Sequence, residues 1–152
     1  MNDLYEKDFY AWCIEQAKIL RENNWQNLPF DFDNLAEEIE SLGKQWRREL
    51  VSRLKILFLH LLKWHYSSSD VRDWHKNSWL RSITCQRTDI PKFLKKHPSL
   101  KATIEEDIEE AYLNAREDAS YEGGILLQDM PISCPFAIED ALNMGWFPKD
   151  RY

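Results

Sequence analysis

The chain has 152 residues, of which 43% are hydrophobic and 30% are charged, and it carries a formal net charge of −6 at pH 7. The length is that of one ordinary domain with a real core, and the composition excludes a disordered chain. The longest apolar run, ILFLHLL, is too short to span a bilayer and contains a histidine. We therefore expect a single globular domain over residues 1–152, with no membrane partner.

The first predicted element is a helix over residues 4–23. Asp3 is a suitable N-cap, and Glu6 follows it at the spacing of a capping box. The next stretch, NNWQNLPFDFDN, breaks the helical period and contains a proline. This stretch therefore predicts a loop.

The second predicted element is one long helix over residues 34–66, with Asn34 at its start. Its apolar residues recur in steps of three and four from Leu35 to Trp64, without interruption at Gly43, as one face of a helix requires. A glycine inside a helix costs up to ~1 kcal/mol relative to alanine. We interpret Gly43 as a point where another helix approaches closely, and a hinge is the alternative.

A third helix is expected from the turn SSSD to residue 96, with Ser69 or Asp70 as its cap. Pro91 predicts a kink or a break in it. The helix should turn a basic face outward and an apolar face inward. The residues expected to point inward are Val71, Trp74, Ile83, Ile90 and Leu94.

A fourth helix should begin at Ser99 and end at the pair Gly123 and Gly124, a C-terminal signal. The tail predicts a loop, a short helix with Pro135 in its first position, and an aromatic clasp. The expected fold is all-α: a bundle of four main helices and a short C-terminal helix, built around the helix 34–66.

The charges are strongly segregated along the chain. Residues 1–43 hold 3 basic and 10 acidic side chains, residues 44–101 hold 14 and 4, and residues 102–152 hold 3 and 12. One interpretation is a basic surface for RNA, DNA or an acidic protein. The other is internal pairing, with acidic helices beside basic ones. Cys13, Cys85 and Cys134 have no metal-like spacing, which favours a cytoplasmic location.

Four polar residues of the long helix lie on or beside its apolar stripe: Glu38, Glu49, Arg53 and His60. Because buried charges need partners, this polar column is either a structural network or the wall of a cleft. In a cleft, His60 could act as an acid or base near neutral pH.

Arg53, six intervening residues and His60 resemble the loosest form of the Arg-x(4–6)-His motif of HEPN-type helical ribonucleases. That resemblance implies that Arg53 stabilises the scissile phosphate and His60 transfers a proton, without a metal. Leu54 departs from the pattern, because the family prefers a polar residue after the arginine. Arg53 and His60 are therefore the candidate catalytic residues of an alternative function, a toxin-like ribonuclease.

The segment 64–96 interleaves aromatic and basic side chains, which can stack bases and contact phosphates, although tryptophans at helical spacing also build cores. The candidate binding residues are Trp64, His65, Arg72, Trp74, His75, Lys76 and Trp79. The acidic clusters at 37–40 and 105–110 are interpreted as solvated helix faces. We find no Gly-rich phosphate loop, paired-cysteine motif or G-x-S-x-G elbow, and expect no cofactor and no metal.

Four segments together resemble the domain of unknown function 29 family: DFYAW at 8–12, NLAEEIESLGKQWRREL at 34–50, HLLKW at 60–64 and CPF at 134–136. Phe136 stands where the family pattern has tryptophan. The resemblance implies a small all-helical bacterial protein, often cyanobacterial, and implies no established activity. We therefore expect a non-enzymatic interaction module, with homo-oligomerisation left open.

Overall fold

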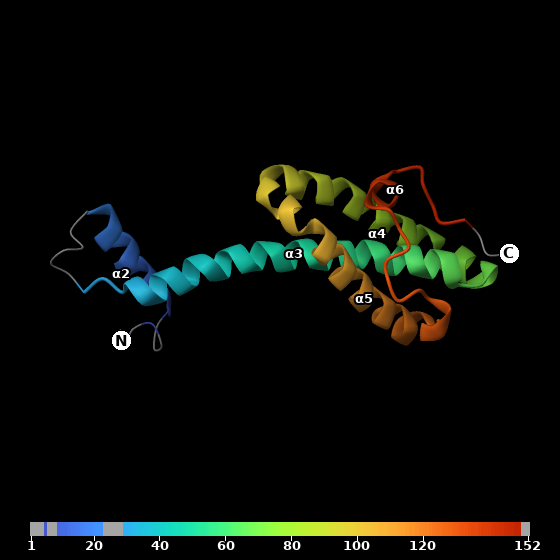
Figure 1. Cartoon of the computed structure of the whole chain (residues 1–152), viewed down its shortest axis with the longest axis horizontal. Helices are drawn as coiled ribbons and strands as arrows, with labels where there is room; N and C mark the ends of the chain where they lie inside the picture. Colours follow the sequence, from blue (N-terminus) through green and yellow to red (C-terminus); the bar gives the residue numbers. More distant parts are fainter. Residues whose placement is uncertain (1–4, 6–8, 23–28, 150–152) are drawn as a thin grey trace. The chain divides into compact units, whose positions relative to one another are not determined.

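The computed structural model describes residues 5, 9–22 and 29–149 of the chain. All regular elements in these residues are helical (Figure 1), so the predicted all-α class with four main helices and a short C-terminal one is confirmed. The α-helices are α2 (Phe9–Arg21), α3 (Phe32–Tyr66), α4 (Ser69–Lys96), α5 (Ile104–Gly123) and α6 (Ile138–Leu142). The chain forms two compact units, residues 1–46 and 47–152, and the single domain stays a prediction.

The first unit contains α2 and the start of α3. Gln16 and Ile19 of α2 are buried, and Gln16 Oε1 accepts a hydrogen bond of 3.0 Å from the Asp31 N–H. The Asp31 carboxylate accepts in turn from the N–H of Asn34, at 3.4 Å. Asp31 therefore caps α3, which begins two residues before the predicted Asn34. The predicted cap at Asp3 and Glu6 lies outside the described residues.

The long helix α3 is continuous through Gly43, as predicted. The expected close approach of another helix is not found in the described part of the chain, because a Cβ placed on Gly43 would meet no atom within 4 Å. The helix is not interrupted there, and the hinge alternative stays a prediction.

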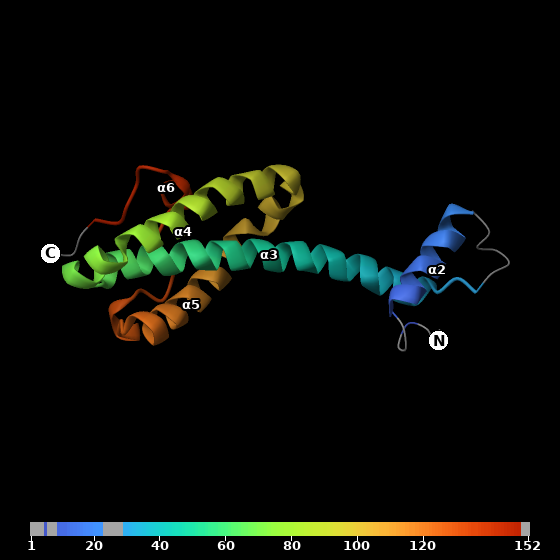
Figure 2. The same ribbon diagram turned by 180° about the vertical axis from the view of Figure 1, so that it is seen from behind.

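The core of the second unit lies where α3 meets α4 and α5, which flank it in both ribbon views (Figures 1 and 2). From Leu50 onward, the apolar stripe of α3 is fully buried at Leu54, Leu57 and Leu61. Small side chains on α5 allow its backbone to lie close to this core. The fully buried residues of α5 include Ala111, Ala115 and Ala119.

Helix α4 runs unbroken through Pro91, so the predicted break is wrong, and the kink stays a prediction. Its N-cap is Ser68, whose hydroxyl accepts from the Val71 N–H. Ile83, Ile90 and Leu94 point into the core as predicted. The prediction was wrong for Val71, 44% exposed, and for Trp74, 86% exposed, because the first turns of α4 precede the part of the helix that packs on the core.

The predicted start of the fourth helix was also wrong. A 3-10 segment, Pro98–Thr103, precedes α5, and α5 ends as predicted with Gly124 in the left-handed region at φ 62°. Pro135 lies outside α6, whose N-cap is Ala137, so its predicted place in the first position of the short helix is wrong. The aromatic clasp is present, because the Phe136 ring centroid lies 6.1 Å from that of Phe58 and 5.9 Å from that of Trp146.

Candidate functional site

Arg53 is held by two carboxylates from two helices. Its guanidinium lies 2.8 Å from Glu49 on α3 and 3.2 Å from Asp89 on α4. It also lies over the ring of Phe93, 5.6 Å from the centroid, and Cys85 Sγ donates to Asp89 at 3.5 Å. The positive charge of Arg53 and the negative charges of Glu49 and Asp89 therefore pair with one another within the protein.

His60 is half-buried, and its Nδ1 lies 2.8 Å from the carbonyl oxygen of Ile56. A carbonyl only accepts hydrogen bonds, so Nδ1 carries the proton of the neutral ring and Nε2 is the acceptor. Burial lowers the pKa of His60, although the Ile56 carbonyl acts in the opposite direction. The imidazole is therefore neutral at pH 7.

The predicted polar column does not form one network among the described residues. Glu49 and Arg53 are paired, but His60 bonds to backbone, and Glu38 accepts a hydrogen bond of 2.6 Å from the Tyr5 hydroxyl. Sequence reasoning missed Asp89, because periodicity along one helix cannot reveal a partner on another.

A row of ion pairs joins the basic side of α3 to acidic α5. Asp107 is fully buried and accepts from Arg47 Nε at 2.6 Å and from the Thr103 hydroxyl at 3.0 Å. Two further pairs continue the row: Lys55 with Asp118 at 2.8 Å, and Lys63 with Glu122 at 2.5 Å. These contacts support internal pairing for Arg47, Lys55 and Lys63 of α3.

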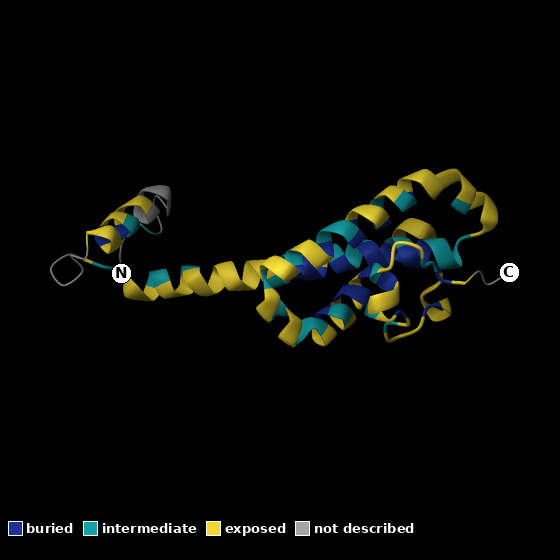
Figure 3. Ribbon diagram, turned by 90° about the horizontal axis from the view of Figure 1, so that it is seen from above, coloured by how far each residue is buried: buried dark blue, intermediate teal, exposed yellow. Residues whose placement is uncertain are grey.

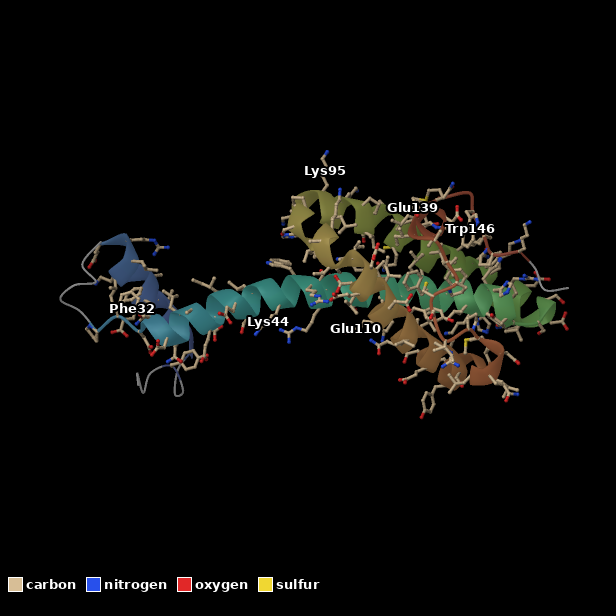
Figure 4. All side chains as sticks on the ribbon, viewed as in Figure 1. Phe32, Lys44, Lys95, Glu110, Glu139 and Trp146 are labelled. Carbon is tan, nitrogen blue, oxygen red and sulfur yellow. The ribbon has the colours of Figure 1, made fainter. Side chains whose placement is uncertain are left out.

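The basic residues on the outer side of α4 differ from those of α3. The described contacts include no ion pair for them, and they are exposed; Figure 4 shows Lys95 extending away from the helices. Trp74 is 86% exposed, and it precedes Arg81 by 7 residues and Lys92 by 18, which places it on the same side of the helix. We call this set the α4 outer face, and it comprises Trp74, Arg81, Lys92, Lys95 and Lys96.

Two of the candidate tryptophans are engaged in packing. The ring centroid of Trp64 lies 4.6 Å from that of Phe147, and the guanidinium of Arg72 lies 5.8 Å from the Trp64 ring. Trp79 is buried and stacks on His75 at 5.4 Å. The rings of Trp64 and Trp79 therefore serve mainly to pack against neighbouring side chains.

The other candidate binding residues divide in the same way. His65 is half-buried and meets the Tyr66 ring edge-on at 4.6 Å. Trp74, His75 and Lys76 are exposed. The structure thus separates the predicted binding segment into a packed set and an exposed set, and the exposed set is centred on Trp74.

Arg87 is a buried cation that the sequence analysis did not single out. Its guanidinium donates three hydrogen bonds to backbone carbonyls of the C-terminal segment: Ala141 at 2.8 Å, Met144 at 3.2 Å and Trp146 at 2.6 Å. Burial lowers its pKa. Its role is structural, because it ties α4 to the tail.

In the described ranges, no three His, Cys, Asp or Glu residues gather in an arrangement that could hold a metal ion. None of the helices in those ranges is long and apolar enough to cross a membrane.

Comparison with known proteins identifies a family. The model of the domain of unknown function DUF29 matches residues 4–147. No curated protein and no solved structure matches the chain at a significant level. Because the family model covers almost the whole chain, this protein belongs to the DUF29 family.

Proposed function

We propose that this protein is a non-enzymatic interaction module that binds single-stranded nucleic acid through the α4 outer face. The observation that carries the proposal is the 86% exposure of Trp74 beside a row of basic residues. Leaving a large apolar ring in water forgoes roughly 25 cal/mol for each Å² of apolar surface that burial would remove. A partner that covers the indole recovers this free energy.

The spacing of the α4 outer face suits an extended anion. Arg81, Lys92 and Lys96 follow Trp74 by 7, 18 and 22 residues, which places all four on one side of a helix. The row is roughly 33 Å long at the rise of an α-helix. It can therefore follow the phosphates of several nucleotides while Trp74 stacks on a base.

Charge pairing inside the protein does not account for this face. The acidic residues of α5 that form ion pairs with α3 are Asp107, Asp118 and Glu122. The lysines of the α4 outer face have no counterpart of this kind among the described contacts. We propose the cytoplasm as the location, where RNA is abundant.

The test is the binding of fluorescently labelled oligouridine to the full chain, followed by anisotropy. Binding should weaken steeply with salt, and Trp74→Ala should weaken it about 5- to 100-fold, the range that a lost base stack gives. Tyr121→Ala is the matched control, because Tyr121 is 91% exposed on α5.

A charge series completes the test. Each of Lys92→Ala and Lys96→Ala should reduce the slope of log K against log salt by about 1, whereas Lys149→Ala, on the exposed tail, should leave it unchanged. Absence of binding at low salt rejects a nucleic-acid partner and leaves an acidic protein as the remaining partner. Binding that is insensitive to Trp74→Ala rejects the α4 outer face.

The alternative, a metal-independent ribonuclease using Arg53 and His60, has one supporting observation: the neutral His60 ring has Nε2 as an acceptor. It is less well supported than the binding role, because Glu49 and Asp89 already compensate the guanidinium of Arg53. Labelled RNA incubated with the protein and with His60→Ala decides between them. Cleavage only by the unaltered protein would establish the ribonuclease, and equal cleavage would indicate contamination.

A further inference from the structure

The first half of α3 carries a second apolar row, separate from the core. Phe32, Leu35, Ile39, Leu42 and Trp46 follow one another in steps of 3, 4, 3 and 4. These are the a and d positions of two heptads, the pattern by which one helix packs along another. We call this row the 32–46 seam.

Four of the five residues of the 32–46 seam are exposed, and Leu35 is half-buried. Ile39 is 61% exposed, Phe32 58%, Leu42 54% and Trp46 40%, and Figure 3 shows the first half of α3 exposed along most of its length. The steps of three and four continue into Leu50, which is fully buried. Burial of the apolar stripe therefore begins only after the seam.

One flank of the seam holds small residues. With Phe32, Ile39 and Trp46 at a positions, Ala36 and Gly43 occupy the neighbouring e positions. A Cβ on Gly43 would meet no atom within 4 Å in the described structure. Side chains this small allow a second helix to approach closely, which gives a reason for a glycine that costs the helix up to ~1 kcal/mol.

The charges of the segment indicate what lies against the seam. Residues 31–40 contain five acidic side chains and no basic one, and residues 41–48 contain three basic side chains and no acidic one. Two copies in parallel would bring the acidic halves together. Arg47 is already bound to Asp107 of its own chain, so Lys44 and Arg48 are the cations available to a second copy. Two antiparallel copies bring each acidic half against these two cations, so the segment is complementary to itself.

We propose that residues 32–46 bind a second copy of this chain, antiparallel, to form a homodimer. In the register centred between residues 40 and 41, Ile39 packs against Leu42 of the second copy and Leu35 against Trp46. The same arrangement brings Ala36 close to Gly43 of the second copy. The interface is a short two-heptad helix pair, independent of the α4 outer face.

The first experiment measures the mass of the full chain in solution by light scattering after size exclusion, over a range of concentrations. The expected result is twice the monomer mass of 18.2 kDa for the unaltered protein and for Ser41→Glu, and the monomer mass for Ile39→Glu. Ser41 is an exposed neighbour outside the seam. Because Ile39 is itself exposed, its substitution leaves the core intact, and unchanged helical circular dichroism verifies this.

The second experiment determines the orientation. Ala36→Cys and Gly43→Cys proteins are mixed, oxidised and mapped by mass spectrometry, which separates the engineered cysteines from Cys13, Cys85 and Cys134. Each protein carries one engineered cysteine, so a link between positions 36 and 43 joins two copies. Links from 36 to 43 between copies are expected, and links only of like to like overturn the antiparallel arrangement. An unaltered protein that stays monomeric, or an Ile39→Glu protein that still dimerises, overturns the proposal itself.

Discussion

Arg47 Nε donates a hydrogen bond of 2.6 Å to Oδ1 of Asp107, a carboxylate that is completely buried. Arg47 itself remains partly exposed, and the hydrogen bond and charge of Asp107 raise its pKa. A second carboxylate on Arg47, that of Glu106, is 77% exposed. Asp107 and Glu106, which are neighbours on α5, thus both pair with Arg47, the first in the protein interior and the second at the surface.

We expect Asp107→Asn to lower the free energy of unfolding by about 1–3 kcal/mol, because a buried acceptor loses its charge-assisted hydrogen bonds to Arg47 and Thr103. Glu106→Gln should change it by less than about 0.5 kcal/mol, since exposed ion pairs contribute little. Urea denaturation of both variants measures the difference. An equal loss of unfolding free energy in the two variants would contradict a larger stabilising role for Asp107 than for Glu106.

Arg87→Met should destabilise the protein by about 3 kcal/mol, because three backbone carbonyls lose their donor in a buried place. The matched control is Arg81→Met on the exposed side of the same helix, expected within about 0.5 kcal/mol of the unaltered protein. Limited proteolysis should also cut the C-terminal segment faster in Arg87→Met. A tail that resists cleavage equally in both variants would argue against Arg87 as its anchor.

The pH dependence of stability should contain a contribution from His60. Burial places its pKa in the folded state below the ordinary value of 6.5, so the unfolded chain binds the proton first as pH falls. Stability is therefore complete above about pH 6.5 and declines as the pH falls toward the folded-state pKa. Unfolding measured between pH 8 and pH 5 should show a smaller decline in His60→Gln, whereas His75→Gln, on the exposed side of α4, should retain it.

Cys85 and Cys134 should differ in reactivity. Burial raises the pKa of Cys134 to about 11, so its thiol stays protonated at neutral pH, whereas Cys85 is exposed. Iodoacetamide at pH 8 should modify Cys85 first, because the thiolate is the reacting form and needs access. Peptide mapping measures both rates, and the denatured chain, where the two should react alike, is the control.

Much of the fold was predictable because helical periodicity is local. The steps from Leu35 to Trp64 predicted one helix through Gly43, and Gly123 followed by Gly124 marked the end of α5. Periodicity gives the direction in which a side chain points from its helix. It does not show whether another part of the protein packs against that side chain. Ile39 and Leu61 share the stripe, yet the first is 61% exposed and the second is fully buried.

The candidate site was less predictable for the same reason. Trp74 and Trp79 both occur at helical spacing in one segment, and only the position of α4 relative to the core decides that the first is exposed and the second buried. The partner of Arg53 on α4, Asp89, depends on how two helices pack. Charge segregation did predict acidic helices beside basic ones, which α3 and α5 form.

The anchoring of the C-terminal segment has a consequence for sequence variation. Arg87 donates hydrogen bonds there to main-chain oxygens, at Ala141, Met144 and Trp146, which every amino acid supplies, and its guanidinium also lies 5.1 Å from the centroid of the Phe147 ring. The exposed residues of this segment, such as Asn143 and Met144, are therefore free to vary as long as the backbone keeps its path. Relatives should tolerate many residue types at these exposed positions but few replacements at Arg87 or at the aromatic residues Trp146 and Phe147, which pack against the core.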